Sequence, residues 1–74
     1  MNEAQIVYLT QSPVELYKVL KFENLAASGG EAKYLIADGM VRVNGETETR
    51  KRKKIYPGDT IEMDNICLKM EMEK

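Results

Sequence analysis

The sequence contains no histidine and no tryptophan, and Cys67 is its only cysteine. Because imidazoles are absent and only one thiol is present, the chain lacks the side chains for the common zinc sites, for a Cys–His nucleophile pair and for a histidine general base. A single cysteine also excludes an intramolecular disulfide, which favours a reducing compartment such as the cytoplasm. Cys67 falls in an apolar segment, where we interpret it as a small hydrophobic residue without chemistry.

Aromatic residues are also few, with four tyrosines and one phenylalanine. The core should therefore be aliphatic, built from Leu, Ile, Val and some of the five Met, and a platform for stacking nucleic-acid bases is disfavoured. No apolar run approaches the roughly 18 residues that a membrane-spanning helix needs, and the amino terminus lacks the pattern of a signal peptide. We expect residues 1–74 to form one small cytoplasmic domain without membrane association.

The acidic residues do not cluster. The 12 carboxylates are distributed among predicted caps, turns and exposed faces, and no spacing suggests an acid–base pair or a metal cage. We therefore predict no catalytic residue, no metal site and no cofactor, and we expect that the protein is not an enzyme.

What the sequence does contain is a block of five consecutive cations in a chain of formal net charge -1. The block comprises Arg50, Lys51, Arg52, Lys53 and Lys54. Adjacent cations repel one another, and a bound polyanion would relieve that repulsion while releasing its own counterions. Charge runs taken alone are more often a solvated loop or a strand edge protected against pairing. The block therefore needs supporting residues before it indicates a binding surface.

Two capping signals predict two neighbouring helices. Ser12, Pro13 and Glu15 have the order of an N-cap, a first-turn proline and a capping-box acid, so we predict that a first helix begins at Ser12–Pro13. Ser28 and Glu31 repeat the capping box for a second helix, in which the Glu31 side chain would reach back to the Ser28 amide. The expected core positions are Leu16, Val19 and Leu20 in the first helix and Ala32, Leu35 and Ile36 in the second. Gly39 is predicted to end the second helix in the left-handed conformation.

Alternating apolar residues and turn signals predict several strands. The Asn44–Gly45 pair is typical of a type I′ hairpin, and Pro57–Asp59 and Asp64–Asn65 mark two further turns. The expected strands are Ile6–Leu9, Val41–Val43, Glu46–Arg50, Thr60–Met63 and Ile66–Met72. Together these elements predict an α+β fold, with two adjacent helices packed on a small, mainly antiparallel β-sheet.

A second group of candidate residues surrounds the start of the second helix. Helix N-terminal amides attract anions, and Gly29 and Gly30 have no side chain to hold a phosphate away. Lys33 lies one turn later on the same side, and Arg42 lies between two valines expected to be buried. Each residue alone has an ordinary interpretation, as part of a capped helix or of a solvated surface. Their position beside the basic block is what indicates a shared surface.

The ordered series of motifs resembles the RNA-binding domain named for ribosomal small-subunit protein S4, also called the alpha-L RNA-binding motif. The matching segments are Leu25–Lys33, Leu35–Ile36, Gly39, Val41, Val43–Glu46, Arg50–Lys53 and Pro57–Asp59. The resemblance spans about Val14 to Met63 and is greatest to short stand-alone bacterial members. It implies that a helix pair and the hairpin after it form a surface for structured RNA.

The resemblance also implies a set of RNA-contacting residues and a biological setting. By position, the contacts would come from Ser28, Gly29, Gly30, Lys33, Arg42, Asn44 and the cations Arg50, Lys51, Arg52, Lys53 and Lys54. The expected partner is ribosomal or transfer RNA, with ribosomal particles as a further possibility, and the expected setting is ribosome assembly or translation. Folded RNA is recognised mainly through shape, phosphates and 2′-hydroxyls, which suits a basic surface with few aromatic residues.

Two other interpretations remain open from the sequence. The basic patch could dock an acidic protein, and the acidic stretch Asp59–Glu73 could even pair with the basic block of a second copy. Binding to DNA shares the same electrostatics, but the sequence shows no recognisable reader of the major groove. The sequence alone indicates neither which RNA is bound nor the oligomeric state.

Overall fold

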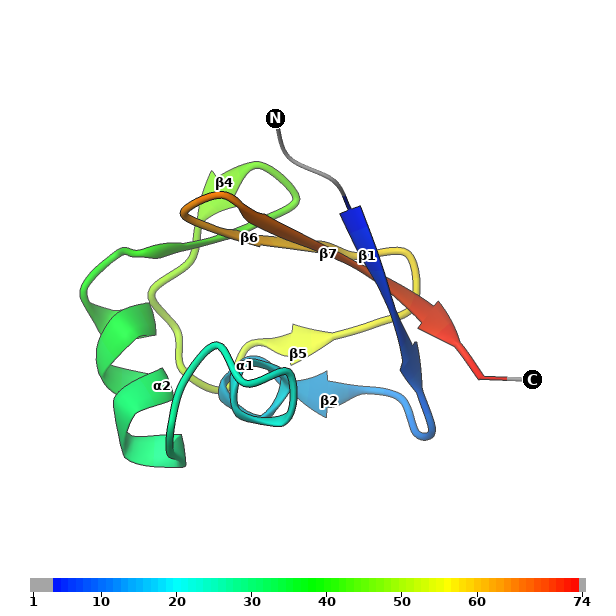
Figure 1. The fold of residues 1–74 in the computed structure, drawn as a ribbon, viewed down its shortest axis with the longest axis horizontal. Helices are drawn as coiled ribbons and strands as arrows, with labels where there is room; N and C mark the ends of the chain where they lie inside the picture. Colours follow the sequence, from blue (N-terminus) through cyan, green and yellow to red (C-terminus); the bar gives the residue numbers. More distant parts are fainter. Residues whose placement is uncertain (1–3, 74) are drawn as a thin grey trace.

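The computed structural model describes residues 4–73 and confirms the α+β class, with two helices on one side of a five-stranded sheet (Figure 1). The elements are β1 (Ala4–Leu9), β2 (Val14–Glu15), α1 (Leu16–Phe22), α2 (Gly29–Ala37), β3 (Val41–Val43), β4 (Glu46–Thr47), β5 (Lys54–Ile55), β6 (Thr60–Met63) and β7 (Ile66–Met72). The sheet order is β1-β7-β6-β3-β4, and β2 and β5 form a separate two-stranded sheet. All pairs are antiparallel except β1 with β7, so the sheet is mainly antiparallel as predicted.

The core among the described residues is aliphatic, as the composition predicts. Its fully buried side chains include Leu16 and Leu20 of α1, Ile36 of α2 and Leu68 of β7. Every buried residue among residues 4–73 is hydrophobic, and none of them is aromatic. Alternation along the strands turns one face of the sheet toward the helices and leaves the other face without a covering layer. The five-stranded sheet therefore has one covered face and one open face.

The predicted start of the first helix is wrong. Ser12 and Pro13 precede a short strand rather than cap a helix, and α1 begins only at Leu16. The amides of Leu16 and Tyr17 donate to the carbonyl oxygens of Lys53 (2.9 Å) and Lys51 (3.2 Å), so a distant segment caps this helix. No side chain makes a cap hydrogen bond at Glu15. The buried stripe predicted for α1 is nevertheless confirmed, because Leu16, Val19 and Leu20 are all buried.

The second helix follows the prediction closely. The Ser28 hydroxyl accepts a hydrogen bond from the Glu31 amide at 3.2 Å, and Gly39 adopts a φ of 80° just beyond the helix. One detail differs, because the Glu31 carboxylate accepts from the Ala27 amide (3.3 Å) rather than from that of Ser28. Ala32 and Ile36 are fully buried, and Leu35 is partly buried against the core.

The hairpin and the two last strands are confirmed, with one correction. Asn44 and Gly45 have φ values of 53° and 85°, as a type I′ turn requires, and β6 and β7 have the predicted bounds. The strand after the turn, however, ends at Thr47 instead of continuing to Arg50. Backbone pairing to β3 continues as far as the Glu48 amide, which donates to the Val41 carbonyl oxygen at 2.9 Å, and the Glu48 carboxylate then accepts from the Arg50 amide at 3.0 Å.

Candidate nucleic-acid interface

The basic segment, Arg50–Lys54, is held in place by its own backbone. The carbonyl oxygens of Lys51 and Lys53 accept hydrogen bonds from the first amides of α1, and Lys54 pairs with Glu15 in the β2–β5 sheet. The sequence did not predict this strand pairing. Fixing the backbone in this way directs the side chains outward, and all of them are exposed except that of Lys53, which is half-buried. The segment is therefore a fixed feature of the fold and not a free loop.

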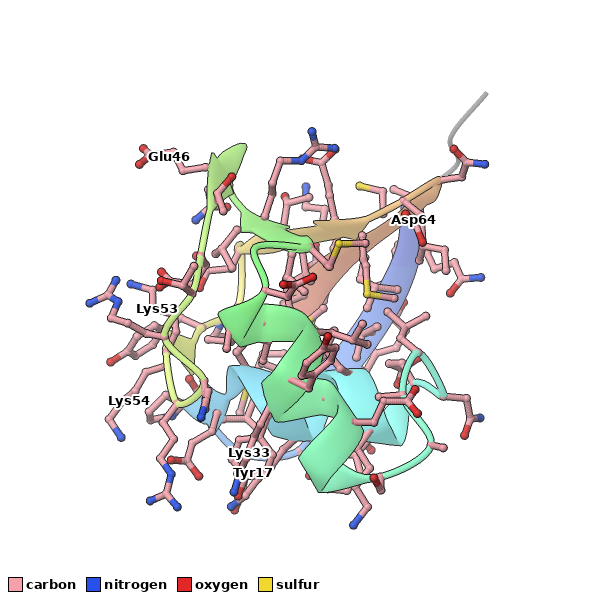
Figure 2. All side chains as sticks on the ribbon, turned by 90° about the vertical axis from the view of Figure 1, so that its left-hand side faces the viewer. Tyr17, Lys33, Glu46, Lys53, Lys54 and Asp64 are labelled. Carbon is pink, nitrogen blue, oxygen red and sulfur yellow. The ribbon has the colours of Figure 1, made fainter. Side chains whose placement is uncertain are left out.

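Tyr17 of α1 connects this segment to the start of α2. The Lys33 ammonium lies 4.6 Å from the centroid of the Tyr17 ring, which is a cation–π distance. The ring also packs against the backbone at Gly29, where a Cβ atom would lie 3.7 Å from it. Through its amide, Tyr17 is bonded to Lys51 at 3.2 Å. Figure 2 shows Tyr17 and Lys33 together near the start of α2, with Lys53 and Lys54 on the adjoining part of the surface.

Two of the five cations of the basic segment are engaged by carboxylates. The Arg50 guanidinium forms a two-point pair with Glu48, at 2.9 and 3.0 Å. This hydrogen bonding lowers the pKa of Glu48 from 4.5 to about 2, and it raises the pKa of Arg50. Arg52 lies 4.0 Å from Glu15, a looser contact between partly exposed groups.

Like Lys21 and Lys69, the four lysines predicted to contact RNA have no carboxylate within 4.0 Å among residues 4–73. They are Lys33, Lys51, Lys53 and Lys54. An unpaired surface ammonium keeps its full charge for a ligand, whereas a paired one must first give up its partner. We refer to these four residues as the lysine cluster.

The amino end of α2 adds backbone donors beside the lysine cluster. The first helical hydrogen bond runs from the Ala32 amide to the Ser28 carbonyl oxygen at 3.0 Å, so the amides of Gly29 and Gly30 precede the hydrogen-bonded turns. Gly30 is exposed and Gly29 is half-buried under the Tyr17 ring. The structure thus brings Ser28, both glycines and Lys33 together, as the sequence analysis expected.

Arg42 lies apart from that group, and Asn44 lines a hollow with Arg50 and Lys53 of the basic segment. Arg42 alternates with buried Val41 and Val43, so its side chain is on the open face of the sheet, where it lies 3.6 Å from Glu62. The Asn44 side chain donates to Asp59 at 3.0 Å and accepts from the Thr60 amide at 2.9 Å. These two hydrogen bonds of the Asn44 side chain connect the hairpin turn to the start of β6.

The residues missed by the sequence analysis are Tyr17, Glu48 and Glu15. Tyr17 carried one weak signal, as an aromatic residue beside the buried stripe of a helix. Nothing local could show that its ring meets Lys33, because the two residues come from different helices. For residues 4–73, no group of three or more Cys, Asp or Glu side chains is placed to hold a metal ion. No helix in the same range has the length and apolar character to cross a membrane.

A helix pair beside a basic segment, on a mainly antiparallel sheet, defines the alpha-L class of RNA-binding folds, and comparison with known proteins agrees. A family model described as "S4 domain" matches residues 7–71, and the chain belongs to this family of RNA-binding domains. The resemblance found in the sequence is therefore confirmed. Proteins of the S4 RNA-binding domain type are typically non-catalytic.

Two curated relatives and one solved structure illustrate the similarity. The Escherichia coli (strain K12) protein named "Putative RNA-binding protein YbcJ" is 52% identical over 48 residues, covering 65% of this chain and 69% of that protein. The Bacillus subtilis (strain 168) protein named "Probable ribosome maturation protein RlbA" is 35% identical over 53 residues, covering 72% and 75%. The solution structure of E. coli YbcJ, described as revealing an "ALFAL motif involved in RNA-binding", superposes with a TM-score of 0.71 and 39% identity over 96% of this chain and 91% of that one.

Proposed function

We propose that this protein binds structured RNA, ribosomal or transfer RNA, without catalysing a reaction, and that it acts in ribosome assembly or translation in the cytoplasm. The observation that carries the proposal is the lysine cluster beside the open amides of Gly29 and Gly30. Ammonium groups and helix N-terminal amides are both ligands for phosphate oxygens. Their grouping on one surface suits the phosphate backbone of a folded RNA.

The form of this surface favours folded RNA over single strands. Single-stranded nucleic acid is held largely by aromatic stacking, and Tyr17 has its ring packed against Lys33 and Gly29. A-form RNA, by contrast, offers phosphates and 2′-hydroxyls across a wide, shallow groove. A rigid basic surface built from a helix end and an ordered segment can follow such a groove.

The ribosomal part of the proposal is supported by the relatives. The name of the B. subtilis relative states a role in ribosome maturation, and that of the E. coli relative states RNA binding. Ribosomal particles at an intermediate stage of assembly are therefore proposed as the natural partners.

The test measures affinity against salt for a fragment of ribosomal RNA, a transfer RNA and a DNA duplex of equal length. If each residue of the lysine cluster neutralises one phosphate, the slope of log affinity against log salt should be about -2.8 to -3.6, since each phosphate contributes roughly 0.7 to 0.9. Lys33→Glu should weaken binding and flatten the slope, whereas Lys69→Glu, an exposed lysine of β7 outside the cluster, is the matched control. A slope near zero, or equal losses in both variants, would contradict the proposal.

A separate capture experiment tests whether the lysine cluster docks an acidic protein instead of RNA. Partners are captured from cells with and without ribonuclease treatment. Partners held through the lysine cluster are expected to be lost with the RNA. Proteins that stay bound through the lysine cluster after RNA removal would favour docking to an acidic protein instead.

A further inference from the structure

Within the part of the chain that the structure describes, strand β1 leaves one of its edges unpaired. It stands at the end of the sheet order, with β7 as its neighbour. The Leu9 carbonyl oxygen accepts from the Glu73 amide at 2.9 Å on the β7 side, so the backbone groups of Gln5, Val7 and Leu9 face β7. Because alternate residues face opposite edges, the N–H and C=O groups of Ile6 and Tyr8 face outward. Such an edge can accept an added strand.

A groove runs beside this free edge. It is lined by Val7 and Leu9 of β1, by Val14 and Val19, and by Phe22 at the end of α1, and its volume is about 160 Å³. An apolar cavity of roughly 150 Å³ can accommodate a benzene molecule, so the groove has room for one apolar side chain. The Phe22 side chain at its rim is 65% exposed.

Exposed apolar side chains continue from the groove along β1 and the end of β7: Ile6 and Tyr8 lie on the open face of the sheet, and Met72 is in register with Leu9. Ile6, Tyr8 and Met72 are exposed by 53%, 61% and 45%. They line a second hollow together with Glu71 and Glu73, and Tyr8 borders both hollows, so the apolar surface is continuous. Large exposed apolar side chains gathered in one place mark interaction surfaces more often than scattered ones do.

Carboxylates surround this apolar strip. Glu23 borders the groove, and Glu71 and Glu73 border the second hollow. Among residues 4–73, none of the three has a basic group within 4.0 Å. In the same range, the open sheet face also carries two cations, Lys69, which is paired in register with Ile6, and Arg42, which is paired with Glu62. The carboxyl ends of β1 and β7 are thus apolar with an acidic margin, and they lie on the opposite side of the molecule from α2 (Figure 1).

We propose that the free edge of β1 docks an extended segment of a protein partner in which apolar and basic side chains alternate. The segment adds as a strand whose backbone pairs with Ile6 and Tyr8. One of its apolar side chains enters the groove at Phe22, and its cations meet Glu23, Glu71 and Glu73. Because this surface lies away from the lysine cluster, RNA and the protein segment can be bound together.

A second copy of the chain suits this edge less well than a basic segment does. The described part of β1 has the sequence AQIVYL, which contains no charged residue. Pairing two copies through β1 would leave the acidic margin without cations. Charge complementarity therefore selects a foreign basic segment.

The experiment titrates the full-length, isotopically labelled protein with a short capped peptide that alternates lysine and valine, and follows backbone amides by NMR. Hydrogen exchange at the Ile6 and Tyr8 amides should slow about tenfold at saturation, because those amides gain an acceptor. The same peptide with glutamate in place of lysine, or with proline in place of valine, should give no protection. Equal binding of the glutamate peptide, or shifts without protection at Ile6 and Tyr8, would overturn the proposal.

Two variants localise the interaction. The double variant Glu71→Gln/Glu73→Gln should weaken peptide binding about fivefold while leaving RNA affinity unchanged, and Glu46→Gln on exposed β4 is its matched control. Tyr8→Pro removes one outward N–H and should abolish the protection of the Ile6 amide against hydrogen exchange. If this variant unfolds, Phe22→Ser, at an exposed position on the rim of the groove, takes its place and should weaken peptide binding. A wild-type dimer that sediments as such and already protects the Ile6 and Tyr8 amides would show that a second copy occupies the edge, and would refute the foreign partner.

Discussion

The amino end of α2 and the outer edge of β1 present opposite charges on opposite sides of one small domain. The side with the amino end of α2 carries the lysine cluster, which comprises Lys33 of α2 and three lysines of the basic segment. The side with the β1 edge carries Glu23, Glu71 and Glu73 around an apolar strip. Between them, Arg42 and Arg50 are paired with carboxylates. The formal net charge of -1 is therefore the sum of two unlike surfaces and describes neither of them.

The largest expected effect comes from reversing charge on the basic side. Lys51→Glu/Lys54→Glu should lower RNA affinity by at least about 30-fold, since two phosphate contacts become repulsive. Both side chains are exposed, so the melting temperature should hardly change. Filter binding and thermal melting measure the two quantities. A comparable loss in Lys69→Glu would mean that total charge, and not the lysine cluster, governs binding.

A smaller effect is expected where Tyr17 positions the basic side. Tyr17→Ala removes the ring that holds Lys33 and should weaken RNA binding about fivefold. Tyr17→Phe keeps the ring and should bind nearly as well as the wild type, which distinguishes positioning from a hydroxyl contact. Isothermal titration with a ribosomal RNA fragment provides the measurement. If both variants bind alike, the ring does not act through Lys33.

Arg42 tests how far the RNA surface extends. Because its side chain lies on the open sheet face and is near Glu62, Arg42→Glu should change RNA affinity by no more than about twofold. The effect can be read from the same titrations. A large loss would show that the RNA also contacts the open face of the sheet, and the simple division into two sides would fail.

The smallest effect is expected from Glu48, which pairs with Arg50. The pKa of Glu48 is lowered to about 2, so the pair stabilises the fold above the ordinary pKa of 4.5, and this contribution is lost as the pH falls through about 2. In Glu48→Gln the free energy of unfolding should therefore fall less between pH 4.5 and about pH 2 than it does in the wild type. Acid unfolding followed by circular dichroism measures this difference. Glu48→Gln should also release Arg50 and raise RNA affinity slightly. An unchanged acid-unfolding curve would show that the pair adds nothing measurable.

Much of the fold was predictable because its signals are local. The Ser28 cap, the left-handed Gly39 and the Asn44–Gly45 turn each depend on residues within one or two turns of the chain. The bounds of β6 and β7 followed from alternation and from the turn that joins them. The candidate site was predictable in outline for the same reason, since Ser28, both glycines and Lys33 belong to one helix.

The remainder depended on contacts between distant parts of the chain. The start of α1 is set by the carbonyl oxygens of Lys51 and Lys53, and a local pattern at Ser12 and Pro13 is no guide to that. Tyr17 became part of the site only when two helices packed together. Likewise, five consecutive cations look equivalent in sequence, but a carboxylate two residues away engages Arg50 and Glu15 lies near Arg52, while the three lysines have no carboxylate within 4.0 Å among residues 4–73.

The backbone bonds from the basic segment to α1 have an entropic consequence. Ordering a flexible chain costs roughly 1–2 kcal/mol per residue, and here Leu16 and Tyr17 order the segment when the protein folds. That loss of entropy is therefore not repeated when RNA is bound. An isolated peptide of Arg50–Lys54 carries the same charges but would lose its freedom on binding, so its affinity for RNA should be far lower than that of the folded domain.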